Sequence, residues 1–265
     1  MKLGLRGKVV LVTGASHGIG RAISLAFAEE GCRLALASRT QEALAAVTKE
    51  AEALGADACH WVTDVTDPDQ AEALAEASSR EWGRIDVLVN NAGGGLAKPF
   101  EAVRNEEWEH TVNLNFLSAV RLSRAVLPMM KEQKGGQIIN IAALSGRVPR
   151  FGQIASNAAK AALINFTESL AAEIAPYGIR VNAVCPAAVF NDRWQERLLR
   201  YGKEHGLPPE QAMAELAAKR IPLGRFGRPE EVASVVVFLA SERAGFITGA
   251  SILVDGGMGR TVSAP

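Results

Sequence analysis

A glycine-rich segment near the N-terminus has the residue types and the spacing to bind phosphate groups. Residues Thr13–Gly20 directly follow the apolar run Val9–Val12. Gly14 permits a tight turn, Gly18 lets the backbone approach a pyrophosphate, and Gly20 allows a helix to pack closely on the strand. Free N–H groups at the start of that helix, and the positive end of its dipole, attract phosphate. A glycine pattern between a buried strand and a helix therefore predicts a dinucleotide site.

The end of the next apolar run indicates which nicotinamide dinucleotide to expect. An acidic residue there would bind the ribose hydroxyls of NAD and repel a 2′-phosphate, but the sequence has Ser38-Arg39-Thr40. A hydroxyl and a guanidinium form charge-assisted hydrogen bonds with such a phosphate, and His17 could add a partial positive charge. We therefore predict NADP(H), with a solvated arginine at a strand end as the alternative interpretation of Arg39.

The elements that must position these groups alternate between short apolar runs and longer amphipathic segments. The predicted strands cover residues 9–12, 33–37, 85–89, 137–141, 180–184 and 250–254, with a further one ending near 62–63. The predicted helices cover residues 18–30, 41–53, 68–82 (with Asp67 as N-cap), 106–131 (broken near Pro128) and 153–174. This alternation predicts an α/β fold: a Rossmann-type doubly wound parallel sheet of about seven strands with helices on both faces.

We expect one domain over residues 1–265, because the middle of the chain has no low-complexity tract or charge run that would indicate a linker. A polar segment between Asn191 and Leu223 contains a predicted helical insert, Asp192–Arg220. It follows the sixth strand, where ligands bind in such sheets. We interpret residues 191–223 as a substrate lid, and a pair of surface helices fits the sequence equally well.

Composition excludes several classes of partner. The 29 basic and 29 acidic residues balance, which gives no electrostatic reason to expect nucleic acid or an anionic membrane as partner. No apolar stretch is long enough to cross a bilayer. Cys32, Cys59 and Cys185 are widely spaced and match no metal or disulfide signature. We expect a cytoplasmic protein without a bound metal.

Taken together, the motifs resemble the classical short-chain dehydrogenase/reductase family, and within it the 3-oxoacyl-(acyl-carrier-protein) reductase type. The resemblance covers essentially the whole chain. The glycine turn is similar to the family's cofactor motif, and further similarities lie at Asp64-Val65, Asn90–Gly93, Val181–Pro186, Ile221–Arg225 and Val254–Gly257. With the residues above, the resemblance implies a cofactor site of Gly14, Ser16, His17, Gly18, Ile19, Gly20, Ser38, Arg39, Asp64, Val65, Asn91, Ala92, Gly93, Lys160, Pro186 and Val189.

The same resemblance implies a catalytic site with two replaced groups. In the family, a tyrosine that exchanges a proton with the substrate oxygen lies four residues before a lysine, so both face one side of a helix. A serine thirteen residues before the tyrosine holds that oxygen. Here the lysine is Lys160, so the tyrosine position holds Ser156 and the serine position holds Ala143. Asn115 matches the catalytic asparagine, and the implied catalytic set is Asn115, Lys160 and Ser156.

Three hypotheses follow, because losing a positioned general acid costs about 10²- to 10⁴-fold in rate. In the first, the protein reduces a 3-oxoacyl thioester or related ketone to an alcohol. Its proton would then come from Ser156, Asn115 and a water held by Lys160, or from Tyr201 of the lid. In the second, it is a catalytically impaired NADP(H)-binding regulatory protein. In the third, it is a partner subunit of a competent reductase. The retained Lys160 and Asn115 favour the first.

Substrate and assembly are less constrained by the sequence. We expect the pocket to be lined by residues 94–96, 144–147, Phe151 and the insert, with Arg147 and Arg150 as candidates for meeting an anionic substrate. Cys185 could be a reactive thiol or a buried filler. The helices predicted over residues 106–131 and 153–174 carry wide apolar faces, and the resemblance implies a homotetramer or homodimer built on them.

Overall fold

The strands of the computed structural model form one parallel sheet in the order β3-β2-β1-β4-β5-β6-β7. They are β1 (Val9–Thr13), β2 (Arg33–Ser38), β3 (Asp57–Val62), β4 (Val87–Asn90), β5 (Gly136–Ile141), β6 (Ile179–Pro186) and β7 (Ser251–Val254). From β1 the chain moves outward to β3 and then returns to β4 on the other side. The predicted Rossmann-type doubly wound sheet is confirmed, with its switch point between β1 and β4.

The structure describes residues 2–260, without the side chains of residues 192, 193 and 260. Met1 and residues 261–265, which the expected domain includes, lie outside the described residues. The helices are α1 (Gly18–Glu29), α2 (Gln41–Ala53), α3 (Pro68–Trp82), α4 (Asn105–Val112), α5 (Ser118–Glu132), α6 (Ile154–Ile174), α7 (Asp192–His205), α8 (Pro209–Arg220) and α9 (Pro229–Ala240). No helix in this range is long and apolar enough to cross a membrane.

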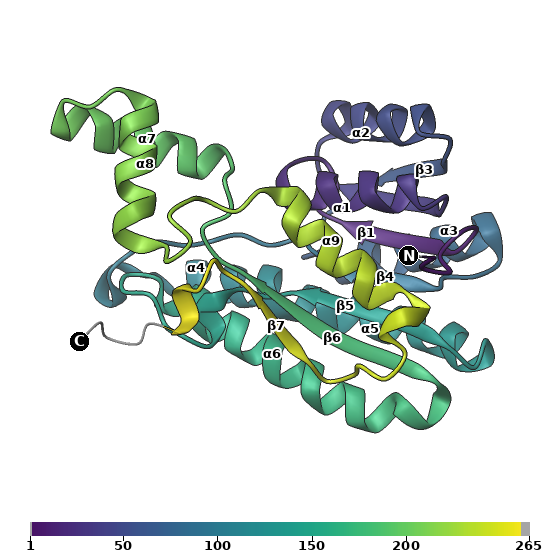
Figure 1. Cartoon of the computed structure of the whole chain (residues 1–265). Coiled ribbons are helices and arrows are strands. Elements are labelled where there is room, and N and C mark those ends of the chain that lie inside the picture. Colours follow the sequence, from purple (N-terminus) through teal and green to yellow (C-terminus); the bar gives the residue numbers. More distant parts are fainter. Residues whose placement is uncertain (1, 261–265) are drawn as a thin grey trace.

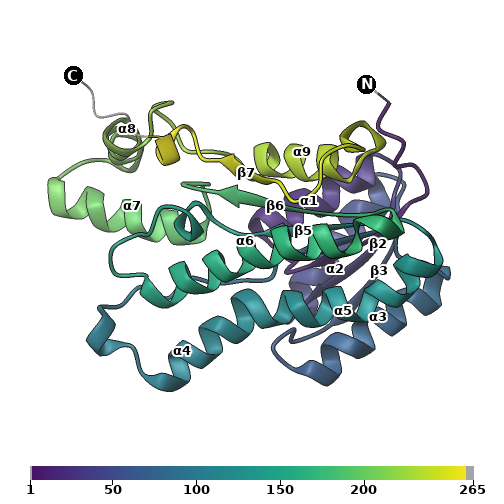
Figure 2. The ribbon, with the colours of Figure 1, turned by 90° about the horizontal axis from the view of Figure 1, so that it is seen from below.

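The helices cover both faces of the sheet, as Figures 1 and 2 show. Helices α1, α2 and α9 pack on one face, and α3, α5 and α6 on the other. Successive strand residues point to opposite faces: Val10 and Val12 join the first core, and Leu11 joins the second. A strand buried on both faces must be apolar at every position, which explains the continuous run in β1.

The long helical region predicted over residues 106–131 is interrupted, but not where the sequence indicated. The predicted break near Pro128 is wrong, because α5 continues through that residue to Glu132. The interruption is instead a π-helical turn, Asn113–Leu117, between α4 and α5. Such a turn inserts one extra residue into the helix and is frequent at functional sites. Here it holds Asn115 almost completely buried, at 2% exposure.

Helices α7 and α8 form the polar insert that the sequence predicted as helical. They lie at the end of the molecule to which the strands point (Figures 1 and 2). A small apolar cluster beneath the pair includes Leu198 of α7, Leu216 of α8 and Phe226 in the following loop. The insert therefore has a core of its own, separate from the cores on either face of the sheet.

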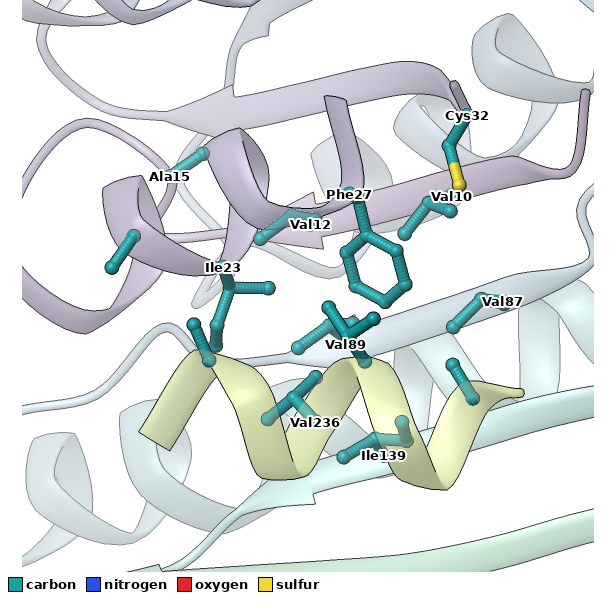
Figure 3. Packing of buried hydrophobic residues seen from close by; sticks show 14 of the residues in the cluster. Val10, Val12, Ala15, Ile23, Phe27, Cys32, Val87, Val89, Ile139 and Val236 are labelled. Atoms are coloured by element: carbon teal, nitrogen blue, oxygen red, sulfur yellow. The ribbon is translucent and has the colours of Figure 1, made fainter. Parts of the chain in front are cut away.

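On the face of the sheet covered by α1, α2 and α9, the largest fully buried side chain is Phe27 of α1. Its ring packs between the sheet and Val236 of α9 (Figure 3). We predict that Phe27→Ala lowers the free energy of unfolding by about 3–5 kcal/mol, because it removes the ring and leaves a cavity that helix and sheet cannot close. Urea unfolding measures this loss. Phe246→Ala, at a fully exposed phenylalanine, is the matched control and should leave the unfolding midpoint nearly unchanged. Equal losses in the two variants would contradict the prediction.

Candidate cofactor and active site

A cleft of about 920 Å³ opens at the carboxyl ends of the strands, beside the switch point of the sheet. Its walls come from the turn after β1, the segments after β2, β3, β4, β5 and β6, and helices α6 and α7. All of the residues assigned to the cofactor and catalytic sites from the sequence line this one cleft. Segments up to 175 residues apart in the chain thus meet here because parallel strands end at a common edge.

The turn after β1 is held in place by close packing. A methyl group on Gly20 would lie 2.0 Å from the carbonyl oxygen of Gly14, so only glycine allows α1 to approach the turn this closely. The amide nitrogen of Asn91 donates hydrogen bonds to the carbonyl oxygens of Thr13 (2.9 Å) and Gly14 (3.1 Å). The Asn91 side chain therefore ties the end of β4 to the turn and determines the shape of this end of the cleft.

The donor groups at this end fit a phosphate-bearing dinucleotide. His17 is the N-cap of α1 and makes no side-chain capping bond, so the first N–H groups of the helix have no capping acceptor. A methyl group on Gly18 would meet nothing within 4 Å, which leaves an open cradle above the turn. At the end of β2, the buried Ser38 hydroxyl has no hydrogen-bond partner among the described residues, and the exposed Arg39 lines the cleft beside it.

Asp64 lies after β3, on the same side of the cleft. Its carboxylate accepts hydrogen bonds from the backbone N–H (2.9 Å) and the hydroxyl (2.7 Å) of Thr66. Partial burial raises the pKa of Asp64, but these hydrogen bonds and the charge of Arg39 outweigh it, so the net pKa is lowered. Asp64 is therefore an ionised hydrogen-bond acceptor at neutral pH.

Asn115 and Lys160 converge on the loop after β4. A methyl group on Gly93 would lie 3.0 Å from Asn115 Oδ1 and 3.3 Å from Lys160 Nζ. Asn115 Oδ1 accepts a hydrogen bond from the backbone N–H of Gly94 (3.0 Å), while its Nδ2 donates to the carbonyl oxygen of Thr111 (3.0 Å). The π turn between α4 and α5 thus aims this amide at the loop that lines the cleft.

Lys160 is a buried ammonium group in the wall of the cleft. Its Nζ donates a hydrogen bond of 2.7 Å to the carbonyl oxygen of Ile141 at the end of β5. Burial lowers the pKa of Lys160 from 10.5 to about 8, opposed by the nearby Cys185. The group is still mostly protonated at pH 7, but it releases a proton far more readily than a lysine in water.

Ser156 lies one helical turn before Lys160, so both side chains are on the same face of α6. The Ser156 hydroxyl accepts a hydrogen bond from the backbone N–H of Leu96 (2.9 Å) and lines the cleft. Because the oxygen is the acceptor in that bond, the hydroxyl proton is left to donate elsewhere.

Tyr201 does not belong to this cluster. Its hydroxyl donates a hydrogen bond to Glu215 of α8 (3.0 Å) and accepts one from Lys219 (3.2 Å). Its ring packs against the core of the insert, and it is not among the residues that line the cleft. The structure gives no support for Tyr201 as a proton donor.

Several lining residues differ from those expected. Arg147 forms an ion pair with Glu168 of α6 (3.6 Å), and the Phe151 side chain is fully exposed; neither lines the cleft, so both expectations are wrong. Cys185 is completely buried, which raises its pKa to about 11. It therefore packs in the core and is not a reactive thiol. Within residues 2–260, no three His, Cys, Asp or Glu residues group in a way that could hold a metal ion.

The sequence indicated that the insert would line the pocket, and α7 does so, but it did not single out which side chains of α7 take part. The residues there are Trp194, Arg197 and Arg200, which follow one another at intervals of three. That spacing places them along one face of a helix. The interval was a usable signal, but it shows only a shared face and not that the face meets the cleft.

Comparison with known proteins agrees with this geometry. Residues 14–259 match a family model described as enoyl-(acyl carrier protein) reductase. A 3-oxoacyl-[acyl-carrier-protein] reductase, FabG of Thermotoga maritima, is 40% identical over 254 residues, covering 96% of this chain and 98% of that protein. The chain belongs to the short-chain dehydrogenase/reductase family. The predicted similarity to 3-oxoacyl-(acyl-carrier-protein) reductases is confirmed.

Two solved structures extend the comparison. L-sorbose reductase of Gluconobacter frateurii, complexed with NADPH and L-sorbose, matches with a TM-score of 0.95 at 35% identity, covering 99% of this chain and 100% of that one. A variant of the actinorhodin polyketide ketoreductase with NADPH matches with a TM-score of 0.90 at 33% identity, covering 96% and 98%. These relatives share the whole fold, the insert included.

The buried Lys160 predicts a pH-dependent stability. Between pH 8 and 10.5 the unfolded chain holds a proton on Lys160 that the folded chain has lost, so this residue makes stability rise with pH. We predict that the wild type gains about 2 kcal/mol relative to Lys160→Met between pH 7.5 and 10, because each tenfold change in proton affinity is worth about 1.4 kcal/mol. Urea unfolding of both proteins at each pH measures it. A constant difference would show that Lys160 titrates normally.

Proposed function

We propose that this protein is an NADP(H)-dependent oxidoreductase that reduces a carbonyl group to an alcohol. The observation that carries this proposal is the single cleft that joins the glycine turn to Asn115, Ser156 and Lys160. A site for a hydride-carrying cofactor and a set of proton-holding side chains in one cavity is what carbonyl reduction requires.

The cofactor residues favour NADP(H). The N-terminus of α1 and the cradle above Gly18 would hold the pyrophosphate, and Ser38 and Arg39 would bind the 2′-phosphate. When bound, the cofactor supplies the hydride that reduces the carbonyl carbon. Lys160 would also orient the nicotinamide ribose. Two structural neighbours contain NADPH, which supports the assignment.

Protonation of the substrate oxygen would follow an altered relay, because Ser156 and Ala143 stand where the family resemblance places tyrosine and serine. The Ser156 hydroxyl, oriented by the Leu96 N–H, would donate its proton to the carbonyl oxygen. Lys160 lies on the same face of α6, and only one of its N–H groups is bonded to the Ile141 carbonyl oxygen. Because its pKa is lowered, it would return a proton to Ser156. Asn115 would keep the Gly93–Gly94 loop in position for both.

Helices α7 and α8 would form the substrate lid of a single domain spanning the chain. Trp194 and Arg197 of α7 line the same cleft as Ser156 and Lys160 of α6. The relatives named FabG, L-sorbose reductase and polyketide ketoreductase act on carbonyl substrates by their names. This supports a 3-oxoacyl thioester or a related ketone as substrate. We further propose a cytoplasmic homotetramer or homodimer assembled through α4, α5 and α6.

One observation favours a second function. Ser156 stands where the family resemblance places a tyrosine, and an alcohol is a much weaker acid than a phenol. A protein with this site could bind NADP(H) and act as a regulatory protein, or as a partner subunit of a competent reductase.

Turnover distinguishes these functions. We predict slow NADPH oxidation by the wild type with a panel of 3-oxoacyl thioesters and small ketones. Ser156→Tyr should be faster by roughly 10²- to 10⁴-fold, because a phenol is a competent general acid beside Lys160. Ser156→Phe is the matched control: it fills the same space and loses the same bond to Leu96, but it has no hydroxyl and should not gain.

The alternatives have their own outcomes. Tight NADPH binding without turnover in either the wild type or Ser156→Tyr would exclude the reductase and favour the regulatory protein. Co-purification with an active reductase of the same family would favour the partner subunit.

Arg39 provides a separate test of cofactor choice. We predict that Arg39→Ala weakens NADPH binding by roughly 10- to 100-fold, the value of a hydrogen bond to a charged group, and leaves NADH binding nearly unchanged. Isothermal titration with both cofactors measures the ratio. Arg33→Ala, at the opposite end of β2 and paired with Asp57 (3.7 Å), should change neither affinity. Tighter binding of NADH than NADPH by the wild type would overturn the assignment.

A further inference from the structure

We propose that the substrate carries a carboxylate or phosphate group, and that Arg150 binds this anion together with Arg197 and Arg200 of α7. This inference rests on the proposed function, since it names the substrate class of the same cleft. All three arginines line the cleft. They come from two separate elements, the segment that leads from β5 into α6 and the lid helix α7.

Arg150 is a half-buried cation without a counter-charge among the side chains that the structure describes. Among the side chains that the structure describes, no carboxylate forms an ion pair or hydrogen bond with its guanidinium. Burial lowers its pKa, and the positive charges of Arg197 and Arg220 lower it further. A partly buried charge with only like charges near it is unfavourable. A bound anion would remove that cost.

The arginines of the lid are oriented by aromatic packing. The Trp194 ring packs edge-on against Phe226, with centroids 4.7 Å apart, and Phe226 is buried in the core of the insert. The Arg197 guanidinium lies 5.2 Å from the centroid of the Trp194 ring. This cation–π contact positions the side chain without neutralising its charge. Arg200 follows three residues later on the same face.

Charge balance at this end of the cleft is strongly positive. Glu196 is the acidic residue that lines it here among the described side chains, against the three arginines. By contrast, Arg147 pairs with Glu168 and Arg225 with Glu231. Among the described side chains, Arg150, Arg197 and Arg200 form no ion pair, and all three lie where α7 meets the cleft.

The position of Arg150 assigns it to the substrate and not to the cofactor. The dinucleotide end already has its own cation, Arg39, and the N-terminus of α1. Arg150 instead belongs to the segment that leads into α6, six residues before Ser156, and its charged neighbours are on α7 and α8. A planar guanidinium there can bind a carboxylate or phosphate through two parallel hydrogen bonds.

The test measures anion binding directly, without turnover. The NADPH-loaded protein is titrated calorimetrically with glutarate and with inorganic phosphate, and with dimethyl glutarate as the uncharged match. We expect at least one anion to bind and the ester not to bind. Arg150→Gln should weaken that binding by roughly 10- to 100-fold, and Arg150→Lys by less. Arg147→Gln, which removes the same charge three residues away but outside the cleft, is the matched control and should have no effect.

The outcomes separate this inference from the proposed function. Anion binding that depends on Arg150, in a protein that reduces no ketone, would leave the anion site standing and reject the reductase. Turnover of methyl acetoacetate as efficient as that of acetoacetate, with no anion binding, would keep the reductase and reject the anion site. If Arg150→Gln lost as much affinity for NADPH as for the anion, the residue would belong to the cofactor site and the inference would be overturned. Melting temperatures of both glutamine variants establish that each is folded.

Discussion

Helix α1 approaches the turn after β1 so closely that even one added methyl group on Gly20 would meet the Gly14 carbonyl oxygen at 2.0 Å. The rest of the site depends on this contact. It directs the N-terminus of α1, with its uncapped N–H groups, toward the carboxyl ends of the strands. Asn91 then joins the turn to β4, and the cleft opens beside the switch point of the sheet.

The chemistry proposed for the cleft depends on how two polar side chains are buried. Asn115 is turned inward by a π turn, and Lys160 is carried into the wall of the cleft by α6. Each is bonded to backbone groups, so neither is left unsatisfied. Burial also makes Lys160 a weaker base than a lysine in water. Under the proposed reaction, Ser156 would draw on Lys160 as a proton source that an isolated alcohol lacks, so replacement of a phenol would not abolish proton transfer.

Under the proposed function, the insert would add a second layer of control. Its helices share a small core of their own, and the side chains of α7 that line the cleft include Arg197 and Arg200. A lid built this way would close more firmly on an anion than on a neutral ligand. Only an anion can bind both Arg150, in the segment that leads into α6, and the arginines of α7. Substrate choice would then be determined by the insert, and the site beneath it would supply the hydride and the proton.

The sequence by itself determined the sheet, its cofactor turn and the residues assigned to the cofactor and catalytic groups, because these depend on local patterns. Apolar runs, glycine positions and the interval between Ser156 and Lys160 are readable without coordinates. The tertiary structure decided what depends on contacts between distant segments. It moved the helix interruption from Pro128 to the π turn, where Asn115 bonds the loop after β4. It paired Arg147 with Glu168 and left Arg150 facing the arginines of α7. Two arginines three residues apart look alike in a sequence, and only the neighbours that the fold brings to each give them different roles.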